Sequence, residues 1–355
     1  MDLKTKKIRS RLVRLGLDAL LVSEEYDIRY LTGFFFSGML MIFSRKGPLL
    51  CFVDPMNKTL AERIAKKSVI KIHIIPGDPI KKAVERIKKD KMKKVGIDNY
   101  DLSVFTLDML IKFAPDTQFV SHTKKKLITS CIRNVRSIKS DKEIRILRKA
   151  AKETVRIWNK VKKEFRTGIR EIDVAFLING EISRRGYENS FPTIAAAGKN
   201  TAYPHAIPSV KRLNKGEHLL VDFGIKYKGY CSDLTRVYLN GKIDRQIEEF
   251  MKLVRKAQKS AIKIAKSNVT VSDLVKWAYS VFDTADVQDF VLHGLGHGVG
   301  LEVHECPILY KNAAEKLKKG MVVTFEPGLY KEGLGGIRIE DMILITSKGC
   351  EVLTK

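Results

Sequence analysis

Cysteine is scarce in this chain of 355 residues, which has five, at positions 51, 131, 231, 306 and 350. They show neither the close pairs of a structural zinc site nor the density of a disulfide-rich protein. Long apolar runs are also missing, since the longest, residues 34–43, is interrupted by Ser37 and Gly38 and cannot span a bilayer. The first nine residues lack the apolar core of a secretory signal. These absences predict a cytoplasmic protein with no membrane-spanning segment.

Acidic residues are few relative to basic ones, 40 against 66, which gives a formal net charge of +26. The excess is shared about equally between residues 1–135 and the remainder, whereas a nucleic-acid-binding arm would concentrate it. The lysine-rich stretches 81–82, 88–94 and 124–126 are typical of solvated helix and loop faces. We therefore expect no specific nucleic-acid partner.

Alternating short apolar runs and helical patterns characterise the first 130 residues. Strands are expected at 19–22, 40–43, 49–53, 69–75 and 95–98, and helices at 59–67 and 80–89. This alternation predicts a three-layer α/β domain with a mixed sheet over residues 1–131. A linker is expected at 132–139.

A capping box opens the second region, because Ser140 is followed three residues later by Glu143. Helices are expected at 143–165, 170–185, 245–266 and 272–282, separated and followed by strands. Residues 140–355 are therefore expected to form an α+β domain.

Two aspartates, Asp222 and Asp233, lie on either side of a hairpin turn expected near residues 227–229, within the stretch 218–239. If the loop is Tyr227-Lys228, Asp222 lies directly opposite Asp233, with Cβ atoms about 4.5–5.5 Å apart on one face. Two buried carboxylates held that close repel each other unless a cation lies between them. A metal ion is the natural resolution.

Further donors follow in the last third of the chain. Residues 292–305 contain His293, His297 and His304 in a glycine-rich run, and residues 321–328 predict a strand with Glu326 immediately before a turn. Residues 335–346 are expected to form one strand, with Arg338 and Glu340 on the same face. Four carboxylates and one imidazole suit manganese, cobalt or iron better than a structural zinc.

The local sequences around these donors resemble those of the pita-bread metallopeptidases, and within that family the prolidase and aminopeptidase P branch. They are Val-Asp-Phe-Gly, Ser-Asp-Leu-Thr-Arg, Gly-His-Gly-Val-Gly-Leu, Glu-Pro-Gly and Gly-Gly-Ile-Arg-Ile-Glu-Asp, which contain Asp222, Asp233, His297, Glu326 and Glu340. The resemblance covers nearly the whole chain. It implies a creatinase/prolidase-type N-terminal domain, a pita-bread catalytic domain with a curved antiparallel sheet, and a homodimer.

The resemblance also implies roles for individual residues. Two divalent ions, manganese or cobalt with iron and zinc as further options, would be bridged by Asp233 and Glu340. Asp222 would complete one site, and His297 with Glu326 the other. Glu326 would also act as the acid/base, and His205 and His304 would hydrogen-bond the substrate carbonyl and the developing oxyanion. Supporting roles are expected for Thr235 and Arg338, and His293 is either a direct participant or a packed neighbour.

By the same resemblance, the substrate is a peptide with proline in second position. Prolidases of this branch commonly have a basic residue shortly after the Val-His-Glu string, where it grips the carboxylate of a dipeptide. Here Glu305-Cys306-Pro307 is followed by Ile308, which cannot make that contact. This departure favours removal of the first residue from longer peptides. Strict dipeptidase activity stays open, with Lys311 or Arg338 as the substitute cation.

Other functions predict different sequences. A creatine-type amidinohydrolase shares the fold but does without the metal donors, and a methionine-type aminopeptidase does not need the first 130 residues. A non-catalytic binding protein on this scaffold, including one that binds nucleic acid, predicts eroded donors, whereas all five are in place. Cys231 and Cys306 are expected to be small apolar fillers, because the mechanism requires no thiolate.

Overall fold

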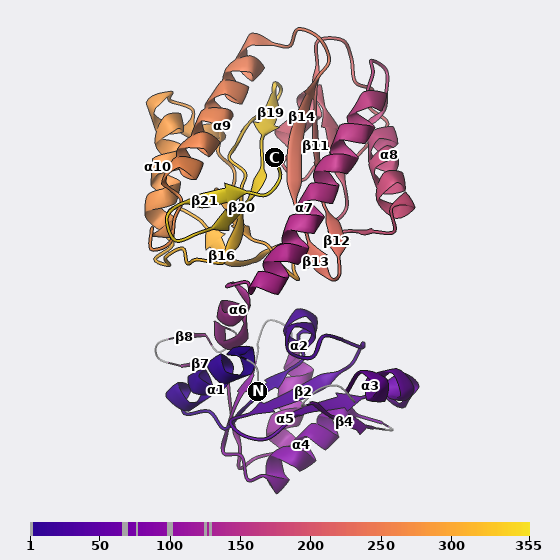
Figure 1. Ribbon diagram of the computed structural model, residues 1–355, viewed down its shortest axis with the longest axis vertical. Helices are drawn as coiled ribbons and strands as arrows, with labels where there is room; N and C mark the ends of the chain where they lie inside the picture. Colours follow the sequence, from indigo (N-terminus) through magenta and orange to yellow (C-terminus); the bar gives the residue numbers. More distant parts are fainter. Residues whose placement is uncertain (1–2, 66–69, 76, 98–101, 124–125, 128–129) are drawn as a thin grey trace. The chain divides into compact units, whose positions relative to one another are not determined.

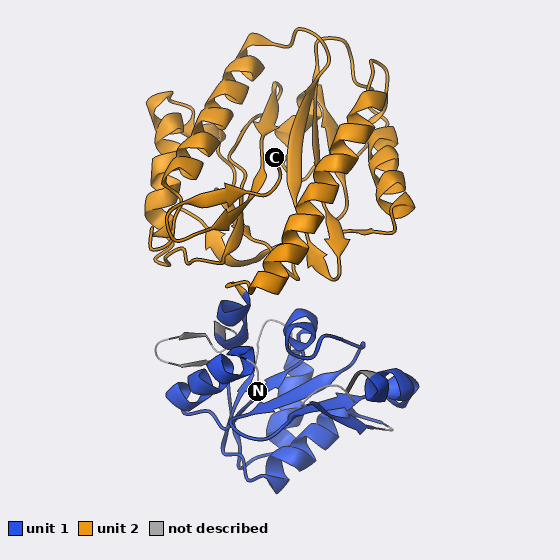
Figure 2. Ribbon diagram, viewed as in Figure 1, with its two compact units in different colours: residues 1–136 blue, residues 137–355 orange. Residues whose placement is uncertain are grey.

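The structure is a computed structural model, described for residues 3–65, 70–75, 77–97, 102–123, 126–127 and 130–355. The chain divides into two units, Met1–Arg136 and Ser137–Lys355 (Figure 2). The boundary falls inside the stretch 132–139 that was expected to join two domains. Residues 66–67, 69 and 98, at the ends of expected elements, and 124–125 of the third lysine-rich stretch lie outside the described residues.

A mixed sheet forms the centre of the N-terminal unit (Figure 1). Its order is β4-β3-β2-β1-β5-β6, with parallel pairs β3/β4, β1/β5 and β5/β6 and antiparallel pairs β1/β2 and β2/β3. The strands are β1 (Ala19–Val22), β2 (Leu40–Ser44), β3 (Leu49–Val53), β4 (Ile70–Ile74), β5 (Lys94–Ile97) and β6 (Gln118–Val120). The α/β fold and mixed sheet expected from the sequence are thus confirmed.

Helices pack around this sheet. They are α1 (Leu3–Leu15), α2 (Glu25–Thr32), α3 (Lys58–Ala65), α4 (Pro79–Lys89), α5 (Val104–Phe113) and α6 (Ser130–Arg136). A separate antiparallel pair is formed by β7 (His122–Thr123) and β8 (Lys126–Leu127). The expected helices correspond to α3 and α4, whereas the other four were not expected. Two of these carry capping groups that the sequence displays, because Glu24 and Ser103 accept hydrogen bonds from the first turns of α2 and α5.

Four helices flank the strands of the C-terminal unit, and all four were expected. They are α7 (Asp141–Val161), α8 (Glu171–Arg184), α9 (Arg245–Ile264) and α10 (Val271–Thr284). The capping box is present, since Ser140 accepts a hydrogen bond from the Glu143 N–H and the Glu143 carboxylate accepts one from Ser140 N. Figure 1 shows α7 and α8 on one flank of the strands and α9 and α10 on the other.

Every strand pairing recorded in the C-terminal unit is antiparallel. The sheet orders are β10-β11-β14, β13-β12-β9, β16-β15-β17-β20-β21 and β18-β19. The strands are β9 (Glu188–Asn189), β10 (Ile194–Ala197), β11 (His218–Phe223), β12 (Ile225–Tyr227), β13 (Tyr230–Cys231), β14 (Leu234–Leu239), β15 (Gly296–Gly298), β16 (Glu305–Leu309), β17 (Val322–Phe325), β18 (Gly328–Lys331), β19 (Gly335–Arg338), β20 (Asp341–Ile345) and β21 (Cys350–Val352).

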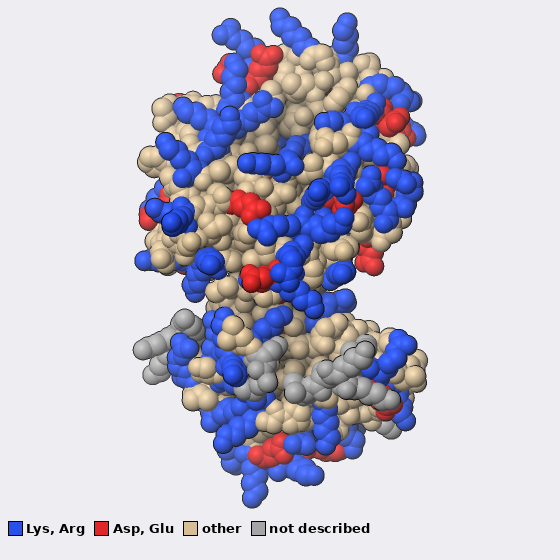
Figure 3. All heavy atoms as spheres, in the orientation of Figure 1, with Lys and Arg blue, Asp and Glu red and all other residues tan. Residues whose placement is uncertain are grey.

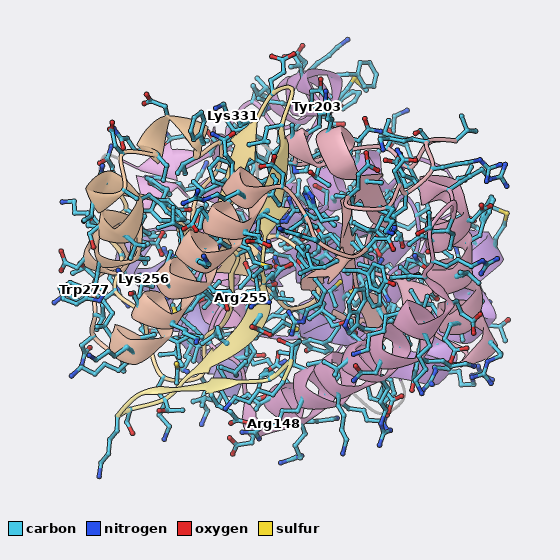
Figure 4. All side chains as sticks on the ribbon, turned by 90° about the horizontal axis from the view of Figure 1, so that it is seen from above. Arg148, Tyr203, Arg255, Lys256, Trp277 and Lys331 are labelled. Carbon is cyan, nitrogen blue, oxygen red and sulfur yellow. The ribbon has the colours of Figure 1, made fainter. Side chains whose placement is uncertain are left out.

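Separate apolar clusters hold the helix pairs against the strands. Ile178 of α8 packs in one cluster with Val221 of β11, and Phe282 of α10 packs in another with Phe325 of β17. Outward-facing positions stay solvated, as Trp277 shows at the outer edge of α10 in Figure 4. Because both flanks are covered in this way, the strands between the helix pairs can carry polar side chains into an enclosed space.

Basic side chains are spread over the visible face of each unit, with acids between them (Figure 3). This distribution agrees with the even division of charge along the sequence. No helix within the described ranges is both long enough and apolar enough to cross a bilayer.

Candidate metal centre

The hairpin that carries the two aspartates pairs β11 with β14. Asp222 lies opposite Thr235, so the register expected from the sequence, with Asp222 opposite Asp233, is wrong. The turn is Lys228-Gly229, with φ of 51° and 82°, which lies within the expected stretch 227–229 but one residue later than the loop assumed for that register. Because of this shift, each residue of β11 lies opposite a residue two positions later in the chain than expected. Because side chains alternate with a period of two, both aspartates still share a face.

The expected single strand over residues 335–346 is also wrong, because β19 and β20 belong to different sheets. The break falls at Ile339 and Glu340, whose backbone groups bond elsewhere. The Glu340 N–H donates to Thr235 O (3.3 Å), and Gln258 Nε2 donates to Ile339 O (3.2 Å). Glu326 follows β17 directly, as expected.

A cavity of about 320 Å³ collects the polar side chains singled out in the sequence. It is lined by Asp222, Asp233, His205, His293, His297, His304, Glu326, Arg338 and Glu340. Thr235 does not line it but donates from Oγ1 to Glu340 Oε2 at 2.8 Å. The structure therefore brings together all of the residues proposed as ligands, catalytic groups and supporting groups.

The donor atoms of Asp233, His297 and Glu340 all lie within 4.8 Å of one another. His297 Nε2 is 3.1 Å from Glu326 Oε1 and 3.7 Å from Asp233 Oδ2. Three buried carboxylate oxygens, Asp222 Oδ1, Asp233 Oδ1 and Glu340 Oε1, have no hydrogen-bond partner in the described part of the chain. Buried charged oxygens without partners are costly, and divalent cations prefer oxygen donors of this kind. The cluster thus fits a metal site.

Electrostatics point the same way. Burial, with the neighbouring acids Glu340 and Asp222, raises the pKa of Asp233 well above its ordinary value, and burial with Glu326 does the same to the pKa of Glu340. Burial also raises the pKa of Asp222, although Arg338 opposes it. Against the effect of burial, the hydrogen bond with His297 lowers the pKa of Glu326 to about 2. A cation would relieve the repulsion among these carboxylates.

Arg338 connects one side of the centre. Its Nη2 donates to Asp222 Oδ2 (2.7 Å), and its Nε donates to Thr235 Oγ1 (3.1 Å). Its Nη1 donates to Tyr330 Oη (2.8 Å) and to Pro204 O (3.2 Å). The Arg338 side chain is only 3% exposed and is bonded to protein at all three nitrogens, an arrangement suited to orienting Asp222.

Tyr330 is a site residue that the sequence analysis missed. Its hydroxyl accepts from Arg338 and is 2.8 Å from His293 Nε2, and burial raises its pKa to about 12. The available signal was its position three residues after Pro327, in the strand that follows Glu326. His293 Nδ1 is 2.8 Å from Gly294 O, so both ring nitrogens of His293 have protein partners.

The remaining histidines face the open part of the cavity. The His304 ring lies 4.2 Å from the His297 ring, at 74° to it, and burial lowers the pKa of His304. His205 is exposed and lines the cavity from the segment that follows η3 (Gly198–Ala202). Both imidazoles can therefore reach a molecule in the cavity.

An apolar wall completes the cavity, formed by Phe191, Ile194, Val303, Ile308 and Tyr310. Ile308 is 44% exposed, and its backbone pairs with His297. Among the lining residues that the structure describes, Arg338 is the only lysine or arginine, and Lys311 is not among them.

Comparison with known proteins agrees with this architecture. Residues 145–347 match the model of metallopeptidase family M24, and residues 4–138 match that of the creatinase/prolidase N-terminal domain. The chain is 33% identical to a Xaa-Pro dipeptidase of Pyrococcus horikoshii, over 100% of this chain and 97% of the relative.

Solved structures show the same fold in both units. A Xaa-Pro dipeptidase from Bacillus anthracis superimposes with a TM-score of 0.92 at 30% identity, covering 99% of this chain and 97% of that one. An X-Pro aminopeptidase from Thermotoga maritima gives a TM-score of 0.84 at 29% identity, with 97% of each chain covered. The expected pita-bread fold is thereby confirmed. Together, the matched models, the full-length relatives and the clustered donors show that this chain is an enzyme of metallopeptidase family M24 with a creatinase/prolidase N-terminal domain.

Proposed function

We propose that the protein hydrolyses the bond before proline in second position, and that it prefers peptides longer than a dipeptide. The observation that carries this preference is the absence of an available cation in the cavity wall, among the described residues. A dipeptide presents its carboxylate next to the scissile bond, where a bidentate arginine would be the natural partner. Arg338 is already engaged with Asp222, Thr235 and Tyr330.

We propose that two divalent ions are held by the five donors, with Asp233 and Glu340 bridging. Asp222 would complete one site, and His297 with Glu326 the other. Divalent ions in such a centre polarise a carbonyl and lower the pKa of water from 15.7 to about 7. The three unpartnered oxygens of Asp222, Asp233 and Glu340 support this assignment.

The chain's own groups would handle the proton and the carbonyl. Glu326, with its lowered pKa, is ionised at neutral pH, so it can accept the proton of the attacking water and pass it to the leaving proline nitrogen. The rings of His205 and His304 line the same cavity and would hydrogen-bond the carbonyl oxygen as it gains charge. Arg338 and Thr235 would hold Asp222 and Glu340 in place.

Strict Xaa-Pro dipeptidase activity is the second candidate, because relatives that match along their full length carry that name. It would require a cation from outside the lining that the structure describes. A homodimer and a cytoplasmic location remain predictions from the sequence.

Hydrolysis of matched Xaa-Pro dipeptides and Xaa-Pro-Yaa tripeptides, with manganese or cobalt added, tests the proposal. We expect a higher kcat/KM on tripeptides. Ile308→Arg should shift the ratio toward dipeptides by about tenfold, since a charge-assisted contact is worth roughly 1.5–3 kcal/mol. Ile207→Arg is the control, because Ile207 is 87% exposed and does not line the cavity. Faster cleavage of dipeptides by the wild type would refute the length preference.

A further inference from the structure

We propose that Lys139 is a positioning residue for His304 and that it acts through Glu305. The inference deepens the proposed function, because it rests on the role given to His304 there. Lys139 lies outside the cavity, in the short segment that precedes α7. It therefore contacts neither substrate nor metal donors, and its effect must pass through the residues that it holds.

The segment that carries Lys139 is fixed to the strand leading into the metal centre. Ile138 forms an isolated antiparallel bridge with Met321, and the Lys139 N–H donates to Gly320 O at 2.8 Å. Met321 directly precedes β17, which ends beside Glu326. The backbone of Lys139 is thus tied to the sheet that contains His297 and whose strand β17 precedes Glu326.

The side chain of Lys139 makes a buried ion pair. Its Nζ donates to Glu305 Oε1 and also to Ser137 O, at 3.3 Å. The side chains of Lys139 and Glu305 are only 1% and 2% exposed. Removing one member of such a pair weakens the charge compensation of the buried partner, so the structure around that partner must adjust.

His304 lies in the loop 299–304, which connects β15 to β16, and Glu305 follows this loop directly. Its backbone pairs with Gly298 of β15, one residue beyond His297. Its carboxylate also lies over the turn of the loop, because a Cβ atom added at Gly300 would come within 2.3 Å of Glu305 Oε1. The Glu305 side chain therefore lies against the turn of the loop, and the Glu305 backbone marks the end of the loop.

The other end of the loop is already held by backbone bonds. Cys231 N donates to Gly300 O at 2.7 Å, and Gly300 N donates to Glu302 O at 2.9 Å. Along the chain, His304 stands between Val303, which lines the cavity, and Glu305. The place of the His304 ring, 4.2 Å from that of His297, thus depends on where Glu305 is anchored. The buried ion pair with Lys139 is one of the contacts that fix the Glu305 side chain.

The test compares Lys139→Met with Lys139→Arg, which keeps the charge, and with Lys160→Met. Lys160 is a matched control, since it pairs with the buried carboxylate of Glu181 but does not line the cavity. The first readout is the NMR signal of the His304 ring in the full chain, metal-free and loaded with diamagnetic zinc, assigned by its loss in His304→Gln. The second is kcat and KM of the metal-loaded enzyme on a Xaa-Pro-Yaa peptide.

We expect Lys139→Met to shift or broaden the His304 signal and to lower kcat by about tenfold or more, with KM changed less than about twofold. Lys139→Arg should restore most of both readouts, and Lys160→Met should change neither. An unshifted His304 signal in folded Lys139→Met, with kcat unchanged, would overturn the proposal.

If Lys139→Met does not fold, Glu305→Gln gives the same test, because the amide keeps the shape and one acceptor but loses the charge. A normal His304 signal and normal kcat in that variant would also overturn the proposal. The signal does not depend on activity. A wild type that cleaves no Xaa-Pro peptide while its His304 signal still responds to Lys139→Met would refute the proposed function and leave the anchor supported.

Discussion

Three buried oxygens, on Asp222, Asp233 and Glu340, set the chemistry of this protein at the residue scale. Each belongs to a carboxylate whose pKa is raised, first by burial and, for Asp233 and Glu340, next by neighbouring acids. A raised pKa in the folded state means that the ionised carboxylate destabilises the metal-free fold at neutral pH. The attraction of these carboxylates for a cation and their cost to the metal-free fold therefore have the same source.

Asp233→Asn tests this connection. Activity should fall by about a thousandfold or more, equivalent to about 4 kcal/mol of transition-state stabilisation, because a donor is lost. The metal-free variant should nevertheless unfold at a higher temperature than the metal-free wild type near pH 7, since one repelling charge is removed. Calorimetry after chelation measures this. The exposed Asp273→Asn is the control, and full activity in Asp233→Asn would contradict the bridging role.

Arg338→Lys tests the support of Asp222. A lysine keeps the charge but cannot donate at once to Asp222, Thr235 and Tyr330, so activity or metal affinity should fall by about 10- to 100-fold. Metal titration followed by kcat measurement separates the two effects. Arg148→Lys is the matched control, because Arg148 pairs with Glu351 at a half-exposed site on α7. Equal losses in both variants would argue against a specific role.

At the element scale, β15 can lie close to β17 only because glycine flanks His297. Gly296 has φ of +155°, and a Cβ there would come within 2.1 Å of Thr324 O, a backbone atom. Gly296→Ala should therefore displace β15, lower metal occupancy and destabilise the protein by about 1–3 kcal/mol. Gly180→Ala in α8 meets nothing within 4 Å and should instead stabilise by about 0.5–1 kcal/mol. Chemical denaturation of both variants checks the contrast.

A charged contact joins α7 and α8. Hydrogen bonds from Arg184, Lys160 and Arg185 hold the pKa of Glu181 well below its ordinary value, although burial opposes them. Because the pKa of Glu181 is lower in the folded than in the unfolded protein, its ionised form stabilises the fold above the unfolded-state pKa of about 4.3. This stabilisation is lost as the pH falls through the folded-state pKa.

Glu181→Gln should accordingly lower stability at pH 7 by about 1 kcal/mol, since the partner cations are largely solvated. The difference from wild type should narrow as pH falls below about 4. Unfolding followed at several pH values measures this, with the exposed Glu249→Gln as the control. A constant difference across pH would show that charge is not the cause.

At the scale of the whole molecule, two units have separate cores, and all five proposed metal donors belong to Ser137–Lys355. Manganese at a hundred times its dissociation constant should stabilise that unit by about 2.7 kcal/mol. Hydrogen exchange, read peptide by peptide, should then slow around β11, β14, β17 and β20. Slowing confined to Met1–Arg136 would mean that the ion binds elsewhere.

Local patterns in the sequence determined much of this protein. Propensity and capping marked the four long helices of the C-terminal unit, because helix signals act within a few residues, and the matching strings identified the five proposed donors. Helix α2 was not expected, although α3 has the same length of eight residues, because α2 is capped by Glu24 and not by one of the usual capping residue types.

Tertiary structure alone decided the register and the supporting contacts. The hairpin turn lies at Lys228-Gly229 because both residues adopt positive φ, and a shift of one residue in the turn moved Asp222 from Asp233 to Thr235. Tyr330 and Lys139 matter through partners that are far away in sequence, such as Glu305. Propensity and spacing describe neighbours along the chain, whereas a buried charge is satisfied by whatever the fold brings next to it.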